Sequence, residues 1–264
     1  MIRLKTMQQL RLMRSAGLIL ARLLVEIKPL IKAGVTTREL DRFAEDSIRA
    51  AGAVPAFRGV RSSPDLKPFP GVICSSINDE LVHGIPGETA LREGDILKVD
   101  VGCRLEGFYA DAARTYSVGP MSEATARLVD TTRDCLDAAT RAMRPDGKLF
   151  DVSVAVQRLA EGRGFSVVRD YVGHGIGTGL HEDPQVPNFV PRMGEFANLS
   201  LRPGLVLAIE PMINEGTFKV RRNAGEWTVR TADGKLCAHF ENTVAVLENG
   251  SAVLTELEPC VLDE

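Results

Sequence analysis

The hydrophobic pattern of the first 52 residues has the period of an α-helix. Between about residues 6 and 31, apolar residues recur every three or four positions with charged residues between them, which predicts a helix with one buried stripe. Pro29 marks the point where this helix weakens. Thr36 and Glu39 have the spacing of a capping box and predict a second helix that ends near Gly52. Two helices therefore precede the first strands.

The pattern then changes to short apolar runs with turn residues between them. Residues 53–70 are rich in proline and glycine and are expected to form a loop. A strand is predicted over 71–78 and a β-hairpin over 96–115, where two apolar-rich runs flank Leu105-Glu106-Gly107. The glycine can adopt the positive φ that a three-residue hairpin loop needs at its last position.

The second half repeats this order. Helical patterns cover 122–143 and 150–162, and strand patterns follow at 205–213, 227–231 and 238–247. This weak internal repeat of helix, helix and strands predicts an α+β fold of pseudo-twofold symmetry. We expect one domain over residues 1–264, with halves of about 1–120 and 121–264.

Composition narrows the class of protein. The chain has 264 residues, of which 44% are hydrophobic, and this suits a soluble globular protein with a sizeable core. Its 32 basic and 35 acidic residues form no basic face and no block of like charge, so we do not expect it to bind nucleic acid.

The cysteine spacing and the N-terminal sequence indicate the cellular compartment of the protein. The five cysteines are odd in number and widely spaced, which favours free thiols in a reducing cytosol over disulfides or cysteine-bound zinc. Three arginines interrupt the apolar N-terminal stretch, so neither a signal peptide nor a membrane span fits. A cytoplasmic protein with no membrane contact is expected.

The predicted hairpin carries the first candidate chemistry. Folding at Gly107 sets Asp100 and Asp111 roughly opposite one another, and like charges about 5 Å apart destabilise a sheet. Either one carboxyl stays protonated or cations lie between the two. Two aspartates in a hairpin are more often surface residues, but Asp100 closes an apolar run and Asp111 lies among small residues.

Further metal-ligand types follow in order along the chain. Glu210 ends an apolar run, where an unpaired charge would be costly, so a ligand role with a possible general-base role is favoured. His174 and His181 lie in a glycine-rich run whose spacing does not match a phosphate-binding loop, and whose glycines would let the backbone approach a metal. Near the C-terminus, period two places His239 and Glu241 on one face of a strand.

The ordered set Asp100, Asp111, His174, Glu210 and Glu241, with His83 and His181 in their own motifs, resembles the type I methionine aminopeptidases over nearly the whole chain. The resemblance implies the pita-bread fold, a pseudo-twofold pair of helix-helix-strand halves around a curved antiparallel sheet. It also implies removal of the initiator methionine from nascent proteins and peptides that have a small second residue.

The resemblance further assigns roles to single residues. Two divalent ions, of cobalt, manganese, iron(II) or zinc, would be held with Asp100 on one ion, Asp111 and Glu241 bridging, and His174 and Glu210 on the other. Such a pair can hold a bridging hydroxide and polarise a peptide carbonyl. The catalytic residues would be His83, His181 and Glu210.

The methionine pocket is where this chain departs from the family. The residues expected to bind substrate are His83, His181, Cys74, Phe69, Leu180 and Trp227. Leu66 and Ser63 stand where an aromatic residue and a cysteine are common, and Asn242 replaces a frequent histidine. His239 replaces the usual glutamine and would lie behind Glu241 or on a solvated strand position.

Two alternatives stay open at this point. One is an Xaa-Pro peptidase of the prolidase or aminopeptidase P type, and the other is a non-catalytic binding paralogue, which loss of ligands would mark. The partners implied are N-terminal methionyl peptides and nascent chains. Ribosome contact has no visible motif, and we expect a monomer.

Overall fold

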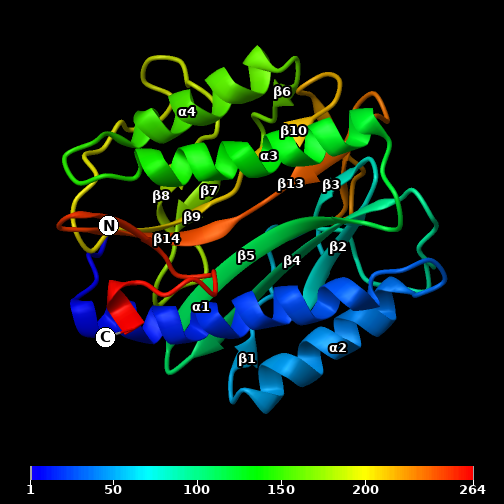
Figure 1. Ribbon diagram of the computed structural model, residues 1–264, viewed down its shortest axis with the longest axis horizontal. Helices are drawn as coiled ribbons and strands as arrows, with labels where there is room; N and C mark the ends of the chain where they lie inside the picture. Colours follow the sequence, from blue (N-terminus) through cyan, green and yellow to red (C-terminus); the bar gives the residue numbers. More distant parts are fainter. Residues whose placement is uncertain (1, 264) are drawn as a thin grey trace.

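Four helices form the outer layers of the computed structural model, which describes residues 2–263 (Figure 1). They are α1 (Met7–Ile27), α2 (Thr37–Ala50), α3 (Glu123–Ala142) and α4 (Leu149–Gly162), with short 3₁₀ turns at η1 (Lys28–Leu30) and η2 (Val261–Asp263). α1 and α3 have 21 and 20 residues, and α2 and α4 have 14 each. In Figure 1 the α1–α2 pair and the α3–α4 pair lie on opposite sides of the strands.

Capping residues define where the first two helices begin. Thr36 and Glu39 form the predicted capping box at the start of α2. A second capping box, made by Thr6 and Gln9, starts α1. α1 then ends at Ile27 and passes into η1, which contains Pro29, because proline cannot continue the helical hydrogen-bond ladder.

The strands between the helices pair antiparallel throughout. In the first half they are β1 (Val54–Pro55), β2 (Ile73–Ile77), β3 (Glu80–Val82), β4 (Ile96–Leu105) and β5 (Phe108–Ser117). In the second half they are β6 (Ser166–Val167), β7 (Gly173–Gly175), β8 (Glu182–Val186), β9 (Val206–Ile209), β10 (Met212–Asn214), β11 (Val220–Arg222), β12 (Val229–Thr231), β13 (Cys237–His239), β14 (Asn242–Leu247) and β15 (Gly250–Val253). These strands form separate sheets, whose strand orders are β1-β4-β2 with β5 beside β4, β13-β10-β6, β11-β12-β3 and β15-β14-β9-β7-β8.

Each helix pair buries its apolar stripe against the sheet of its own half. One core cluster joins α1 and α2 to β2, β4 and β5, and another joins α3 and α4 to β9, β10, β13 and β14. The two halves meet along β5, where Glu241 bonds to Ala113 through both backbone groups, at 2.9 and 3.3 Å. This junction is therefore shared by both halves of the repeat.

The hairpin register differs by two residues from the expected opposition of its aspartates. Asp100 pairs with Ala113, and Asp111 pairs with Gly102. The two carboxylates are thus diagonal neighbours on one face of β4 and β5, still within reach of one another. The turn has two residues, Glu106 and Gly107, instead of the predicted three, because Leu105 pairs with Phe108. Both turn residues have positive φ, +48° and +86°, as a tight two-residue hairpin turn requires.

Two predicted strands are each divided at a candidate ligand. Residues 205–213 form β9 and β10, which belong to different sheets, because Pro211 has no amide hydrogen to continue a ladder. Residues 238–247 are likewise divided into two strands, β13 and β14, which belong to different sheets. Glu210 and Glu241 therefore lie between sheets.

The glycine-rich run is partly strand. Gly173–Gly175 forms β7 between β8 and β9, and a Cβ on Gly173 or Gly175 would collide with the carbonyl oxygen of Ala208 or Asp183. These two glycines are required by the close approach of neighbouring strands, rather than by access to a metal.

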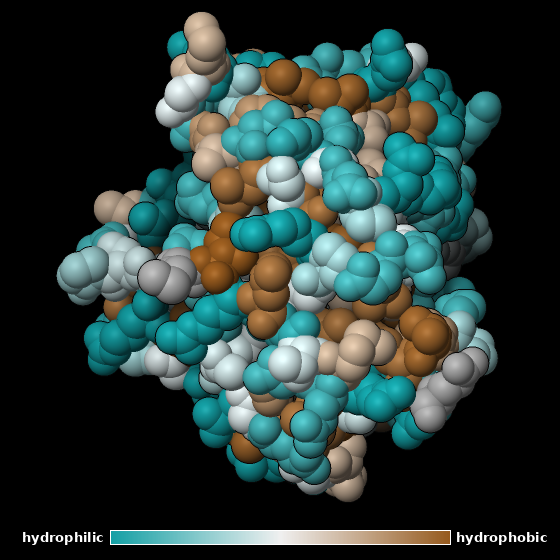
Figure 2. Space-filling view, turned by 90° about the vertical axis from the view of Figure 1, so that its left-hand side faces the viewer, coloured by the Kyte–Doolittle hydropathy of each residue, from teal (hydrophilic) through white to brown (hydrophobic). Residues whose placement is uncertain are grey.

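The outer surface mixes polar and apolar side chains. On the face turned toward the reader in Figure 2, apolar groups occur in small clusters separated by polar ones. Within residues 2–263, none of the helices combines the length and the apolar character needed to cross a membrane. A more continuous apolar lining is found inside the molecule, in the pocket described next.

Candidate metal centre and its pocket

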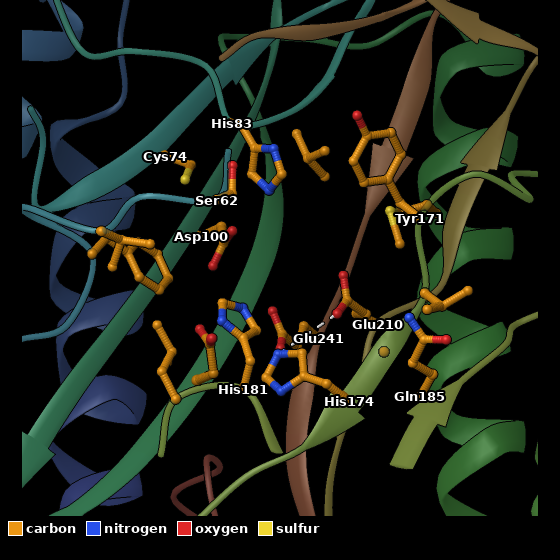
Figure 3. A pocket seen from close by; sticks show the side chains of 18 of the residues that line it. Ser62, Cys74, His83, Asp100, Tyr171, His174, His181, Gln185, Glu210 and Glu241 are labelled. Atoms are coloured by element: carbon orange, nitrogen blue, oxygen red, sulfur yellow. Dashed lines mark ion pairs between the residues drawn. The ribbon is translucent and has the colours of Figure 1, made fainter. Parts of the chain in front are cut away.

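All five predicted ligand side chains line one pocket at the junction of the two halves (Figure 3). Asp100 and Asp111 come from β4 and β5 of the first half. From the second half, His174 comes from β7, Glu210 follows β9, and Glu241 lies between β13 and β14. The site thus depends on both halves folding together.

The ligand atoms lie close enough to share metal ions. One ligand atom from each of Asp111, His174 and Glu241 lies within 4.8 Å of the others, and all three side chains are buried. His174 Nε2 is 3.9 Å from Glu210 Oε1. Two atoms that bind one ion at about 2.1 Å lie at most about 4.2 Å apart, so the separation of His174 and Glu210 fits a common ion.

The acidic cluster has buried oxygen atoms without hydrogen-bond partners. Asp100 Oδ1, Asp111 Oδ1 and Glu241 Oε1 are in this state among the described residues. Burial raises the pKa of Asp100 to about 7. Burial, followed by repulsion from neighbouring carboxylates, raises the pKa of Asp111, Glu210 and Glu241 well above their ordinary values.

Divalent cations resolve this unfavourable arrangement. Arg114 donates to the backbone carbonyl oxygen of Glu241, and its charge offsets only part of the effect of burial and repulsion, so the pKa of the Glu241 carboxyl stays raised. Four carboxylates and one imidazole form a hard donor set that suits two divalent ions of the manganese, iron, cobalt or zinc type. The residues present therefore fit a metal centre.

The tautomer of His174 is fixed by its own strand. Its Nδ1 lies 2.8 Å from the carbonyl oxygen of Gly175, so Nδ1 carries the proton and Nε2 presents a lone pair. Burial lowers the pKa of His174 to about 4, which keeps the ring neutral near pH 7. A neutral imidazole with a free Nε2 is the form that binds a metal.

An apolar wall adjoins the acidic cluster. The pocket encloses about 740 Å³. Its apolar wall consists of Phe57, Val60, Phe69, Cys74, Leu180 and Trp227. Phe69 and Trp227 meet edge to face at 5.3 Å between ring centroids, and Trp227 Nε1 donates to the Lys67 carbonyl oxygen at 2.8 Å. A lining of this kind suits an apolar group of a ligand.

The two remaining predicted histidines face the same space. His181 stacks edge to face on His174 at 4.4 Å between ring centroids. His83 packs against Trp227 and Tyr171 at 5.9 and 5.7 Å. His83 also has φ +60°, an uncommon backbone conformation for a non-glycine residue, and burial lowers its pKa to about 4.

Some pocket residues carried no signal in the sequence. Tyr171, Gln185 and Ser62 line the pocket, and Figure 3 places Tyr171 and Gln185 across from Cys74 and Ser62. Each comes from a segment with no recognisable motif. Only the path of the chain brings these residues to the cavity.

The residues that depart from the family pattern lie at different distances from the pocket. Leu66 packs behind the apolar wall, in contact with its aromatic cluster. Ser63 binds Asp65 within the loop, and Ser62 lines the pocket. Asn242 points away from the cluster, bonding to Arg114 at 2.8 Å and Glu256 at 2.8 Å, whereas His239 is buried beside it.

The fold and the cluster together define a metallopeptidase. A sequence profile described as metallopeptidase family M24 matches residues 11–248. Methionine aminopeptidase 1 of Bacillus subtilis is 46% identical over 97% of this chain and 100% of its own length. Methionine aminopeptidase of Clostridium perfringens is 47% identical over 97% of this chain and 99% of its own length.

Solved structures agree with these sequences. The crystal structure of methionine aminopeptidase from Thermotoga maritima superimposes with a TM-score of 0.90 at 41% identity, covering 97% of this chain and all of that one. The chain therefore belongs to metallopeptidase family M24 and, within it, to the methionine aminopeptidases. The expected pita-bread fold is confirmed.

Proposed function

We propose that this protein is a methionyl aminopeptidase that removes the initiator methionine from nascent proteins and from peptides with a small second residue. One observation carries the proposal. Five ligand-type side chains converge beside an apolar wall, in a chain that matches a methionine aminopeptidase over 97% of its length. The reaction is hydrolysis of the peptide bond that follows an N-terminal methionine.

The ligand roles follow the order of the cluster. Asp100 would help to hold one ion, His174 and Glu210 would help to hold the other, and Asp111 and Glu241 would contribute to both. The mutual proximity of Asp111, His174 and Glu241 supports their binding to one common ion. When bound, two such ions polarise the scissile carbonyl and lower the pKa of a water molecule.

Three side chains act on the substrate. Glu210 accepts the proton of the attacking water on a carboxylate oxygen and passes it to the leaving amine. His181 donates an N–H to the developing oxyanion, and His83 contacts the nitrogen of the scissile amide. The placement of both rings at the pocket, next to His174 and Trp227, supports these roles.

The apolar wall selects methionine. Phe69, Cys74, Leu180 and Trp227 hold the unbranched thioether side chain, because a flexible, polarisable chain gains favourable contacts with aromatic edges and sulfur. Leu66 supports this wall from behind and replaces ring contacts with aliphatic ones. The pocket therefore keeps its preference for methionine despite that departure.

The setting of the enzyme is part of the proposal. We take residues 1–264 as one catalytic domain, because neither half holds all five ligands. We infer a cytoplasmic monomer that acts on chains emerging from the ribosome, and the five free thiols support a reducing compartment. Cobalt, manganese, iron(II) and zinc are the candidate ions.

The test is release of methionine from Met-Ala-Ser after chelation and after adding back each of these four ions. Gly-Pro and Ala-Pro-Gly are assayed in parallel as substrates of the Xaa-Pro alternative. We expect metal-dependent cleavage of the methionyl peptide only. Asp100→Ala and His174→Ala should each lower kcat/KM by about 100-fold or more, because each removes a metal ligand.

A matched variant controls for damage to the hairpin. Glu106→Gln changes an exposed carboxylate at the hairpin turn and should leave activity unchanged. Cleavage of the proline substrates alone would place the protein with the Xaa-Pro peptidases. No cleavage with any ion would favour a non-catalytic binding protein.

A further inference from the structure

A fourth imidazole lies next to the acidic cluster with no partner of its own. His239 is 1% exposed, and neither of its ring nitrogens has a hydrogen-bond partner among residues 2–263. A buried polar ring in this state is costly unless something else satisfies it. The roles proposed above leave His239 unused.

The backbone holds this ring in place. The His239 N–H donates to Thr115 Oγ1 at 3.0 Å, and the Thr115 hydroxyl donates to the His239 carbonyl oxygen at 2.7 Å. His239 also pairs with Met212 across β13 and β10. The side chain is therefore fixed beside the residues that flank the break between β9 and β10.

The ring nitrogen Nε2 points at two carboxylates. It lies 3.7 Å from Glu210 Oε2 and 4.0 Å from Glu241 Oε2. Both separations are longer than the N–H···O limit of about 3.2 Å, by about 0.5 Å at Glu210, so a carboxylate must move toward the ring to form the bond. A lone pair on Nε2 would be repelled by both carboxylates, whereas an N–H would be attracted, so the Nε2–H tautomer is the favourable one.

His174 and His239 therefore flank the Glu210 carboxylate, one with a lone pair and the other with an N–H group. His174 presents a lone pair at 3.9 Å from Oε1, since its proton is committed to the Gly175 carbonyl oxygen. His239 presents an N–H toward Oε2. One carboxylate oxygen thus faces a metal-ligand atom and the other faces a donor.

We propose that His239 is a positioning residue that donates from Nε2 to Glu210 Oε2 and so turns Oε1 toward the ion shared with His174. This rests on the proposed function, in which Glu210 is a ligand. A donor behind a metal-bound carboxylate fixes its orientation and raises affinity for the ion. Glutamine, which the family usually has here, also offers an N–H.

The experiment compares His239→Leu with His239→Gln by calorimetric titration of Mn²⁺ into chelated protein, together with the melting temperature of the metal-free form. His239→Leu should weaken the Glu210-dependent site about 10- to 100-fold. His239→Gln should stay within about threefold of wild type. The metal-free leucine variant should melt at the wild-type temperature or above, because the removed ring had no partner.

Asn214→Leu is the matched control. Asn214 is also buried, pairs with Cys237 on the same two strands, and donates to the Thr217 carbonyl oxygen instead of approaching the cluster. Its replacement should lower the melting temperature and leave Mn²⁺ affinity unchanged. Wild-type Mn²⁺ affinity in His239→Leu would overturn the proposal, as would a loss no larger than that of Asn214→Leu.

Two further measurements keep this inference separate from the proposed function. Glu210→Gln should abolish the site that His239→Leu weakens, and wild-type protein without a Glu210-dependent site would refute the ligand assignment itself. In ¹⁵N-labelled, zinc-loaded protein, long-range proton–nitrogen spectra should show His239 protonated on Nε2. Protonation on Nδ1 alone would refute the donor role while leaving Glu210 a ligand.

Discussion

Arg14 on helix α1 is almost fully buried and donates hydrogen bonds to the carbonyl oxygens of Val253, Leu254, Glu256 and Glu258. Its guanidinium also binds both carboxylate oxygens of Asp263 at 2.9 Å. A bidentate pair of this kind combines direction with charge. Arg14 therefore ties the C-terminal segment to the first helix.

This contact predicts a pH-dependent contribution to stability. The bond from Arg14 lowers the pKa of Asp263 to about 2, below its ordinary value near 4. Stabilisation is therefore present above about pH 4 and is lost as the pH falls toward 2. Asp263→Asn should lower the free energy of unfolding by about 1 kcal/mol at pH 7, after allowing for solvent screening.

Urea unfolding of both proteins at pH 7, 5 and 3 measures this effect. The difference between wild type and Asp263→Asn should be constant from pH 7 to 5 and smaller at pH 3. A difference that stays the same down to pH 3 would show that the carboxylate charge is not its source.

At the scale of elements, helix α2 fixes where the pocket wall begins. Asp41 accepts hydrogen bonds from the N–H groups of Val72 and Ile73 at 2.6 and 2.9 Å. These residues lead into β2, which carries Cys74 in the apolar wall. The first turns of α2 therefore help to position β2 and the pocket wall.

Loss of the cap should weaken this element measurably. Thr36 Oγ1 accepts from the Glu39 N–H at 3.3 Å, and Thr36→Ala removes this bond, which leaves that N–H with only the Thr36 carbonyl oxygen at 3.1 Å. The free energy of unfolding should fall by about 1 kcal/mol, whereas Thr36→Ser should stay within a few tenths. Urea unfolding at pH 7 checks both variants, and equal stability of all three proteins would show that solvent replaces the cap.

At the scale of the whole molecule, the first helix of one half packs against the last residues of the other. Leu10 and Met13 of α1 belong to a core cluster with Val206, Ala245 and Leu254. A Cβ on Gly17 would collide with the Leu254 carbonyl oxygen. α1 can therefore lie at this distance only because residue 17 is glycine.

Two glycine-to-alanine changes should have opposite signs. Alanine normally stabilises a helix by about 0.5–1 kcal/mol relative to glycine, and Gly162, the last residue of α4, has open space around it. Gly162→Ala should therefore stabilise the protein. Gly17→Ala should destabilise it by about 2 kcal/mol or more, because the obstacle is backbone. Equal effects in urea unfolding would show that the helix shifts freely.

Much of the fold followed from local patterns. Helical periods, the Thr36 capping box and the turn at Gly107 act over a few residues, so they predicted four helices and the hairpin. The Thr6–Gln9 capping box is a local pattern of the same kind, with Thr-x-x-Gln spacing. The ends of strands are harder to predict from local patterns. The division at Pro211, for example, depends on which sheet the residues before and after it join.

By itself the sequence determined the order of the elements and the types of ligand side chains, since periodicity and residue chemistry are local properties. Tertiary structure alone decided which residues meet. It placed Asp100 diagonal to Asp111, brought Tyr171 into the pocket and left His239 buried beside Glu210. These contacts join segments far apart in the chain, and their energies come from burial and charge, which no local pattern contains.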